Sequence, residues 1–164
     1  MALEVRKLSE SDAGGIAMLI LESYDNGTGM WFAKRPSREE ADAVVARKLD
    51  MLRKSLLIDN VAMLNGELVG DCEVVVDKQM GLLGILVKSE YRDAGVGKSL
   101  LLASLKDCVR MNVAVVVAEV EESNVHAIGF FTRNGFMISG NEVVERNGKA
   151  SMITRLEFRV SAGQ

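Results

Sequence analysis

The sequence predicts an α/β fold in which a mixed, mostly antiparallel central sheet carries helices on both faces. Apolar runs of strand length, each followed by a helical pattern or a turn, give the order of the elements. Two Asn-Gly pairs lie between apolar runs, and such pairs favour the type I′ turns of β-hairpins. No linker or repeat divides the 164 residues, so we expect a single domain over 1–164.

The first predicted elements are a strand over residues 2–8 and a helix whose start is marked by the polar segment Ser9–Asp12. Apolar residues such as Ile16 and Leu19 then recur at helical spacing. The glycine-rich segment 25–32 interrupts this helix and contains the only tryptophan of the chain. We therefore expect a loop at this point.

A second helix has the clearest signals in the chain. Ser37 and Glu40 form a capping box, in which each side chain bonds the backbone N–H of the other residue. One stripe of the helix is apolar and is expected to face the core: Val45, Leu49, Leu52 and Leu56. The other face carries basic residues, which we interpret as solvated charge: Arg47, Lys48, Arg53 and Lys54.

The remaining strands are predicted from apolar runs and turns. Asn65-Gly66 joins the runs 61–64 and 68–76 into a hairpin, and a strand over 81–87 follows, with a β-bulge expected at Gly84. Further strands are predicted over the ranges 113–120, 136–144 and 151–160, the last two turned by Asn147-Gly148.

A loop with the features of an anion-binding site lies between strand 81–87 and a leucine-rich helix. Gly95 and Gly97 permit positive φ and close approach of the backbone, so successive N–H groups can converge on one bound oxyanion. The dipole of the following helix favours negative charge at the same place. Arg92 and Lys98 add positive side chains at either end.

Two other nucleotide-binding patterns fit this loop less well. Gly97-Lys98-Ser99 matches the end of a P-loop, but Arg92 stands where the first glycine of that motif belongs. The dinucleotide fingerprint needs a third glycine where this chain has Leu100. The pattern that remains, R-x-x-G-x-G, also fits a plain glycine-containing turn between a strand and a helix.

The composition gives no reason to expect a nucleic-acid or membrane partner. The net charge is −3 and the isoelectric point is near 5.3, whereas nucleic-acid binding normally needs a concentrated basic surface. No stretch approaches the roughly 20 apolar residues of a membrane span, and no signal-peptide pattern is visible, so we expect a cytoplasmic location. Cys72 and Cys108 lack metal-ligand spacing, so we expect buried thiols and no metal.

The residues after the anion-binding loop connect these patterns to a known family. The strand that contains Glu119 is followed by Asn124-x-x-Ala127-x-x-Phe130-Phe131-x-x-x-Gly135-Phe136. Together with strand Ile85–Val87 and loop Arg92–Gly97, this order and spacing resemble the GCN5-related N-acetyltransferase (GNAT) superfamily over about half the chain. The resemblance implies the acetyltransferase fold, in which two central strands splay apart.

The resemblance also implies a co-substrate. In that family the pantetheine arm of acetyl-CoA binds along the splayed strand and the pyrophosphate binds the loop. The residues at the matching positions are Ile85, Leu86, Val87, Arg92, Asp93, Ala94, Gly95, Val96, Gly97, Lys98, Asn124 and Phe131. Asn124 has a competing role as a helix cap. The segment 25–32 matches a loop that often lines the acceptor pocket, although an aromatic pair that anchors the loop explains it equally well.

The implied reaction is acetyl transfer from acetyl-CoA to a primary amine by direct attack in a ternary complex. The amine must lose a proton, and the candidate bases are Glu119, at the end of its strand, and then Glu73 on the hairpin. Glu119 is also one of three acids at that strand end, which solvation alone would explain. Many members of the family carry a tyrosine that protonates the leaving thiolate, whereas Phe131 has no proton to donate. Water, or another group such as Tyr24, is then expected to protonate the thiolate.

A second class of function fits the same motifs, namely a non-catalytic module that binds or senses acetyl-CoA. Both hypotheses predict cofactor binding, and only the enzyme transfers acetyl to an amine. The sequence does not specify whether the acceptor is a small molecule or a protein N-terminus. It also leaves a homodimer open.

Overall fold

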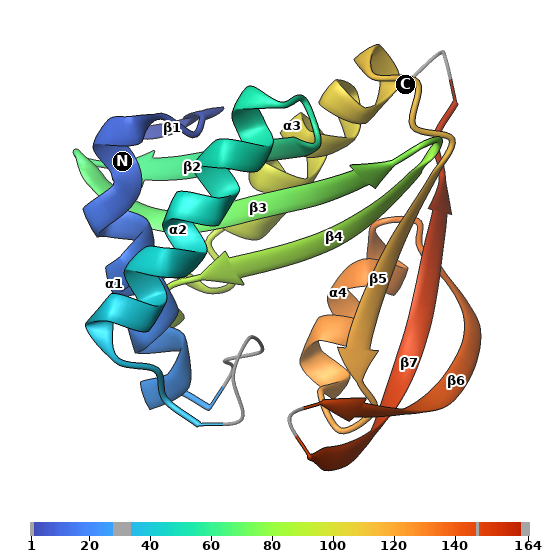
Figure 1. Ribbon diagram of the computed structural model, residues 1–164. Helices are drawn as coiled ribbons and strands as arrows, with labels where there is room; N and C mark the ends of the chain where they lie inside the picture. The colour runs from blue at the N-terminus through green and yellow to red at the C-terminus, as the bar shows by residue number, and fades with distance from the viewer. Residues whose placement is uncertain (1, 28–33, 147, 162–164) are drawn as a thin grey trace.

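The computed structural model describes residues 2–27, 34–146 and 148–161. Seven strands in these residues form one sheet in the order β1-β2-β3-β4-β5-β7-β6 (Figure 1). Their bounds are β1 Leu3–Lys7, β2 Leu57–Leu64, β3 Glu67–Asp77, β4 Met80–Val87, β5 Val115–Glu121, β6 Met137–Arg146 and β7 Lys149–Arg159. Every neighbouring pair in this sheet is antiparallel except β4 and β5. The predicted mixed, mostly antiparallel sheet is confirmed.

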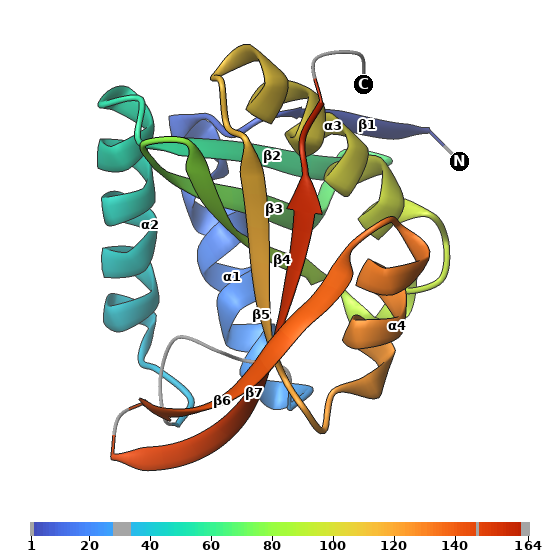
Figure 2. The same ribbon diagram turned by 90° about the vertical axis from the view of Figure 1, so that its right-hand side faces the viewer.

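Helices cover both faces of the sheet, as predicted. Their bounds are α1 Ala13–Asp25, α2 Arg38–Arg53, α3 Val96–Arg110 and α4 Val125–Arg133, with short 3-10 turns η1 Glu10–Asp12 and η2 Ser89–Tyr91. Figure 2 shows α1 and α2 on one side of the sheet and α3 and α4 on the other. Each side has its own hydrophobic core.

The two cores follow from the alternation of side chains along β2, β3 and β4. Residues such as Cys72 and Leu83 pack toward Leu100 of α3, which is fully buried. Residues such as Val61 and Leu86 pack toward the other face, under α1 and α2. Because successive residues of a strand point to opposite faces, each strand contributes to both cores.

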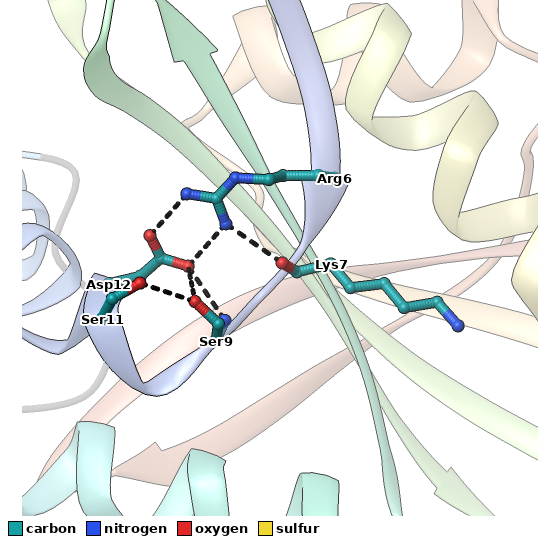
Figure 3. Close-up of polar contacts among 5 residues, drawn as sticks. All are labelled: Arg6, Lys7, Ser9, Ser11 and Asp12. Atoms are coloured by element: carbon teal, nitrogen blue, oxygen red, sulfur yellow. Dashed lines mark hydrogen bonds and ion pairs between the residues drawn. The ribbon is translucent and has the colours of Figure 1, made fainter.

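The junction between β1 and α1 is fixed by Asp12 (Figure 3). Both carboxylate oxygens of Asp12 accept hydrogen bonds of 2.8 Å from the guanidinium of Arg6. The same carboxylate accepts the backbone N–H of Ser9 at 2.9 Å and its hydroxyl at 3.2 Å. The Arg6 guanidinium lowers the pKa of Asp12 below its ordinary value, although burial opposes the shift.

The turn at Asn65-Gly66 and the capping box of α2 are confirmed, whereas the predicted turn at Asn147-Gly148 and the predicted loop over 25–32 include residues outside the described ranges. Asn65 and Gly66 both have positive φ, of 51° and 83°, as a type I′ turn requires. The capping box of Ser37 with Glu40 is present at the start of α2. Leu56, however, lies beyond the end of α2 and is 45% exposed, because the chain leaves the helix at Lys54.

The β-bulge expected at Gly84 is absent. The pairing of β3 with β4 runs without a register shift through Glu73↔Gly84. The irregularities of this sheet lie instead between Ala62 and Met63 and between Ile138 and Gly140. Gly84 is instead the first residue of β4 without a partner on β5.

Candidate active site

Strands β4 and β5 pair over only part of their length and then separate. The parallel pairing runs from Met80↔Val115 to Leu83↔Ala118 and stops there. The rest of β4, residues 84–87, keeps its β3 partner but has no β5 partner. Figure 1 shows the two strands meeting at one end and diverging toward the other. Backbone groups on the open edge need hydrogen-bond partners, so this edge suits an extended, amide-rich ligand.

The anion-binding loop lies where β4 leads into α3. Asp93 and Gly95 have positive φ, of 63° and 83°, and α3 begins at Val96. Alternating backbone conformations of this kind turn successive N–H groups toward one point, and the start of α3 adds its dipole. Nothing lies within 4 Å of the position that a Cβ on Gly95 would occupy. Arg92 and Lys98 are both exposed, so the loop has the space and charge to hold a phosphate.

Gly97 lies in the first turn of α3 and faces neighbouring side chains. A Cβ at this position would lie 3.4 Å from the ring of Phe130 and 3.8 Å from a methyl group of Val87. The glycine therefore lets the first turn of α3 pack closely against α4 and the open part of β4.

The two predicted bases lie on one face of the sheet, on either side of the split. Glu73 is paired with Gly84, the first β4 residue beyond the last β4–β5 pair, Leu83↔Ala118. Glu119 is the residue after Ala118, so it takes the corresponding position on β5. Side chains alternate along a strand, and directly paired residues point to the same face. Glu73 and Glu119 therefore project to the face opposite Leu83 and Ala118, which is the face covered by α1 and α2.

Glu73 has the surroundings of a general base. Its side chain is 17% exposed. Its Oε1 lies 3.6 Å from the position of a Cβ on Gly84, so a side chain at position 84 would lie in contact with this side of the carboxylate. Burial raises the pKa of Glu73, and the ammonium of Lys48, 3.5 Å away, opposes this shift. A raised carboxylate pKa brings the group closer to neutral pH, where a base is most effective.

A buried charge cluster, which we define as Lys48, Asp59, Asp71 and Glu73, lies between α2 and the sheet. The Nζ of Lys48 is 2.6 Å from Oδ2 of Asp71, 3.0 Å from Oδ2 of Asp59 and 3.5 Å from Oε2 of Glu73. Lys48 is 4% exposed, Asp59 2% and Asp71 3%. Burial and the neighbouring carboxyl of Asp71 raise the pKa of Asp59 to about 10.

The prediction that Lys48 is solvated is wrong. Lys48 follows Ala41 by seven residues and Val45 by three, and both of those are buried against the sheet. Residues at these spacings share one helix face. The spacing of Lys48 from these two buried residues indicates that it too faces the sheet. We predicted the opposite because the side chain is charged. Asp59 and Asp71 also carried no motif, because they contact Lys48 only in the folded chain.

Two further residues predicted to contact the co-substrate, Asn124 and Phe131, lie at the start of α4 and within it. Asn124 caps α4, because its Oδ1 accepts the backbone N–H of Ala127 at 3.1 Å. Its competing role as a cap is therefore real, and its side-chain amide N–H groups donate no hydrogen bond to the residues that the structure describes. Phe131 is 3% exposed, with its ring centroid 5.3 Å from that of Phe130 and 5.0 Å from that of Phe136. Its position beside a thioester stays a prediction.

We assign the two cysteines and the histidine no part in the site. Cys72 and Cys108 are buried, as predicted, and burial raises the pKa of both thiols. His126 is exposed. Among the described residues, no group of three His, Cys, Asp or Glu side chains is arranged to hold a metal ion. None of the helices described here has the length and apolar character needed to span a bilayer.

One cavity lies away from the split. It measures about 280 Å³ and is lined by β1 and by residues at the turn between β2 and β3, including Met63 and Asn65. It shares no residue with the anion-binding loop or with the buried charge cluster, so we assign it no part in the site.

A sheet that splits beside a glycine-containing helix start is the architecture implied by the resemblance of the sequence to the acetyltransferases. The profile of the Acetyltransferase (GNAT) family matches residues 23–136. The chain belongs to that family, and its family makes it an acetyl-CoA-dependent N-acetyltransferase.

Individual proteins are similar to this chain in sequence or in fold. The chain is 24% identical over 155 residues to a spermidine N(1)-acetyltransferase of Thermoplasma acidophilum, covering 87% of this chain and 92% of that protein. It is similar in fold to a ribosomal-protein-alanine N-acetyltransferase of Brucella melitensis, with a TM-score of 0.82, 18% identity, and coverage of 95% and 99%. It is also similar to a putative acetyltransferase of Salmonella typhimurium bound to acetyl-CoA, with a TM-score of 0.83, 16% identity, and coverage of 98% and 95%.

Proposed function

We propose that the protein transfers acetyl from acetyl-CoA to a primary amine by direct attack of the amine in a ternary complex. The observation that carries this proposal is the placement of Glu73 and Glu119 on one face of the sheet, on either side of the split between β4 and β5. A base at this position can accept a proton from an amine that enters from the face of α1 and α2.

The residues around the split have the chemistry to hold acetyl-CoA. The backbone of Ile85, Leu86 and Val87 lines the open β4 edge and offers N–H and C=O groups to an amide chain. The loop Arg92–Lys98 offers N–H groups and two positive side chains to the pyrophosphate. The side-chain amide of Asn124 retains donor capacity after capping α4. Phe131 contributes an apolar ring at the base of this site.

The amine needs a base because it arrives protonated. A primary alkyl ammonium has a pKa near 10.4, so at neutral pH only about one molecule in a thousand is neutral. The proton passes to Glu73, the nitrogen lone pair forms the new amide bond, and the bond between the acyl carbon and sulfur breaks. The departing thiolate has a pKa near 8.5 in its thiol form, so water can protonate it in the absence of a tyrosine at position 131.

The structure supports Glu73 over Glu119 as the primary base, which reverses the order suggested by the sequence. Glu73 combines burial, a raised pKa and an open side toward the split. Glu119 is half-buried and interacts with other groups of the chain. We assign Glu119 to the same site, as a second carboxylate that attracts the cationic acceptor.

An acceptor panel tests the proposal. Purified protein is incubated with acetyl-CoA and each of several amines, including spermidine and a peptide with an N-terminal alanine, because relatives act on these two classes. Thiol release and product mass are followed together. Acetylated product with at least one amine supports the enzyme. Tight acetyl-CoA binding with no product on any amine would support the alternative, a binding or sensing module.

The kinetic order tests the ternary complex. When both substrates are varied, direct attack gives intersecting double-reciprocal plots. Parallel plots are the sign of a covalent acetyl-enzyme and would contradict direct attack. A cytoplasmic location and a homodimer remain expectations from the sequence.

A further inference from the structure

We propose that Lys48 is a positioning residue of the active site: it holds the carboxylate of Glu73 ionised and directed at Gly84, while Asp59 retains the one proton of the buried charge cluster. This inference rests on the proposed function, because it explains how Glu73 is kept ready to accept a proton from the amine.

The Nζ of Lys48 lies among side chains that come from α2, β2 and β3. Lys48 reaches from α2 across the interface, Asp59 lies on β2, and Asp71 and Glu73 lie on β3. The Nζ of Lys48 is nearest to Asp71 at 2.6 Å, where it donates a hydrogen bond. Its distance to Glu73 is 3.5 Å, and Glu73 is the least buried member of the cluster. Glu73 is therefore the member of the buried charge cluster that lies beside the split between β4 and β5.

With all three carboxyl groups ionised, the buried charge cluster would carry a net charge of −2, and one bound proton reduces this to −1. One ammonium faces three carboxyl groups, and all four side chains are at least mostly removed from water. Among the residues described, neither oxygen of Asp59 and not Oδ1 of Asp71 accepts a hydrogen bond. A buried carboxylate without donors is strongly disfavoured, whereas a protonated carboxyl can itself donate.

Asp59 is the group that holds this proton. Asp71 already accepts the short hydrogen bond from the Lys48 ammonium, through its Oδ2. Asp59 is more deeply buried, and although the Lys48 ammonium lies 3.0 Å from its Oδ2, neither of its oxygens accepts a hydrogen bond from the described residues. A proton on Asp59, donated to Asp71, provides a partner for orphaned oxygens of both residues. The cluster then holds one positive charge and two negative charges, at Asp71 and Glu73.

The charged groups that face Glu73 set its titration. On α2 these are Lys48 and the more distant Arg47, both of which lower the pKa of Glu73, while Asp71 on β3 raises it. Asp59 lies opposite on β2, and β4 presents only Gly84. Glu119 lies beyond the split on the same face. Removal of Lys48 should therefore make Glu73 harder to ionise, and removal of the Asp71 charge should make it easier.

The test is the pH dependence of kcat/KM in four variants of the full chain, with one acceptor throughout so that its own titration is common to all. Lys48→Met should move the acidic limb to higher pH by about one to two units, because an adjacent opposite charge shifts a carboxyl pKa by about that amount. Asp71→Asn should move it to lower pH. Lys48→Arg should restore the limb toward its wild-type position, and Asp59→Asn should leave the limb in place, because asparagine mimics the neutral acid.

A matched control is Lys54→Met, which removes an exposed lysine from the end of the same helix. It should leave the limb unchanged. If Lys48→Met does not fold, Asp71→Asn still tests the proposal through its opposite shift. Infrared difference spectra offer a readout independent of activity, since a protonated carboxyl band present at neutral pH should disappear in Asp59→Asn.

The results separate this inference from the proposed function. If Glu73→Gln keeps the wild-type acidic limb, Glu73 is not the base and the proposed role of Glu73 fails. If Glu73→Gln abolishes the limb while the folded Lys48 and Asp71 variants leave it unmoved, the role of Lys48 alone is overturned. A shift in Asp59→Asn as large as that in Asp71→Asn would overturn the assignment of the proton.

Discussion

Oε1 of Glu73 lies 3.6 Å from the point where a Cβ of Gly84 would be, so a carboxylate on β3 occupies the space above a glycine on β4. Gly84 is also the residue at which β4 loses its β5 partner. The absent side chain and the absent strand partner therefore occur at one position, and together they expose the proposed base to the split.

A valine at position 84 should weaken catalysis without loss of the fold. Gly84→Val would cover the open side of Glu73, and its Cβ would meet the carboxylate at an ordinary contact distance. Because general-base catalysis is worth roughly 100- to 10,000-fold, we expect kcat/KM to fall by at least tenfold. Steady-state kinetics measure this loss. Leu82→Val, a change at an exposed residue of the same strand, is the control, and an equal effect there would remove the special role of Gly84.

A side chain at position 97 should impair acetyl-CoA binding. In Gly97→Val the added groups would press on Phe130 and Val87 and displace the first turn of α3 from the anion-binding loop. A lost charge-assisted hydrogen bond is worth roughly 1.5 to 3 kcal/mol, so the dissociation constant should rise by at least roughly tenfold. Calorimetric titration measures it. Gly140→Ala, which meets no atoms within 4 Å, is the control. Unchanged affinity in a folded Gly97→Val protein would remove the loop from the binding site.

The sequence predicted most of the fold because its local signals agreed with the tertiary structure. The turn at Asn65-Gly66 and the cap at Ser37 depend on neighbouring residues alone, so both could be predicted. The buried charge cluster could not, because Lys48 lies 23 residues from Asp71 and meets it only when α2 packs on the sheet. A lysine in a helix is exposed in most proteins, and its burial here depends on carboxylates from two strands.

The role of Gly84 also could not be predicted from the local sequence. A glycine within a strand indicates a bulge, a bend or a close approach, and the local sequence does not distinguish them. The split between β4 and β5 is a relation between strands that are distant in the chain. It followed from the resemblance to a family and not from the residues of β4.

A tyrosine at position 131 tests the position of α4 against the co-substrate. If the ring lies beside the thioester sulfur, Phe131→Tyr supplies a proton donor to the leaving thiolate, and turnover should rise while acetyl-CoA affinity stays constant. Rapid-quench or steady-state assays measure turnover, and calorimetry measures affinity. Because Phe131 packs between Phe130 and Phe136, a lower melting temperature with no gain in turnover would instead identify it as a core residue only.

The Asp12 carboxylate should stabilise the fold in a pH-dependent manner. Asp12→Asn removes the charge that Arg6 and Ser9 bond, and we expect a loss of about 1 to 2 kcal/mol in unfolding free energy at pH 7. The pKa of Asp12 is lowered in the folded state, so its contribution is present above the unfolded value and is lost as pH falls through the folded value. Urea unfolding at neutral and acidic pH should show the two proteins converging at low pH.

The control for this prediction is Asp25→Asn, which breaks an exposed ion pair with Arg35. Such pairs contribute little, so this variant should unfold almost as the wild type does at both pH values. A constant difference between Asp12→Asn and wild type across the acidic range would show that the effect of Asp12 is one of shape and not of charge.

The pH profile of acetyl transfer in Glu73→Gln, measured beside Glu119→Gln with the same amine, tests the account most directly. Glutamine keeps the shape of each side chain and removes its basicity. We predict that Glu73→Gln lowers kcat/KM at neutral pH by roughly 100-fold or more. Activity should recover as the pH rises toward the pKa of the acceptor amine, because more of the amine is then neutral. Glu119→Gln should change mainly the KM for the acceptor. A wild-type profile in Glu73→Gln, with the loss found in Glu119→Gln instead, would contradict the assignment of the base.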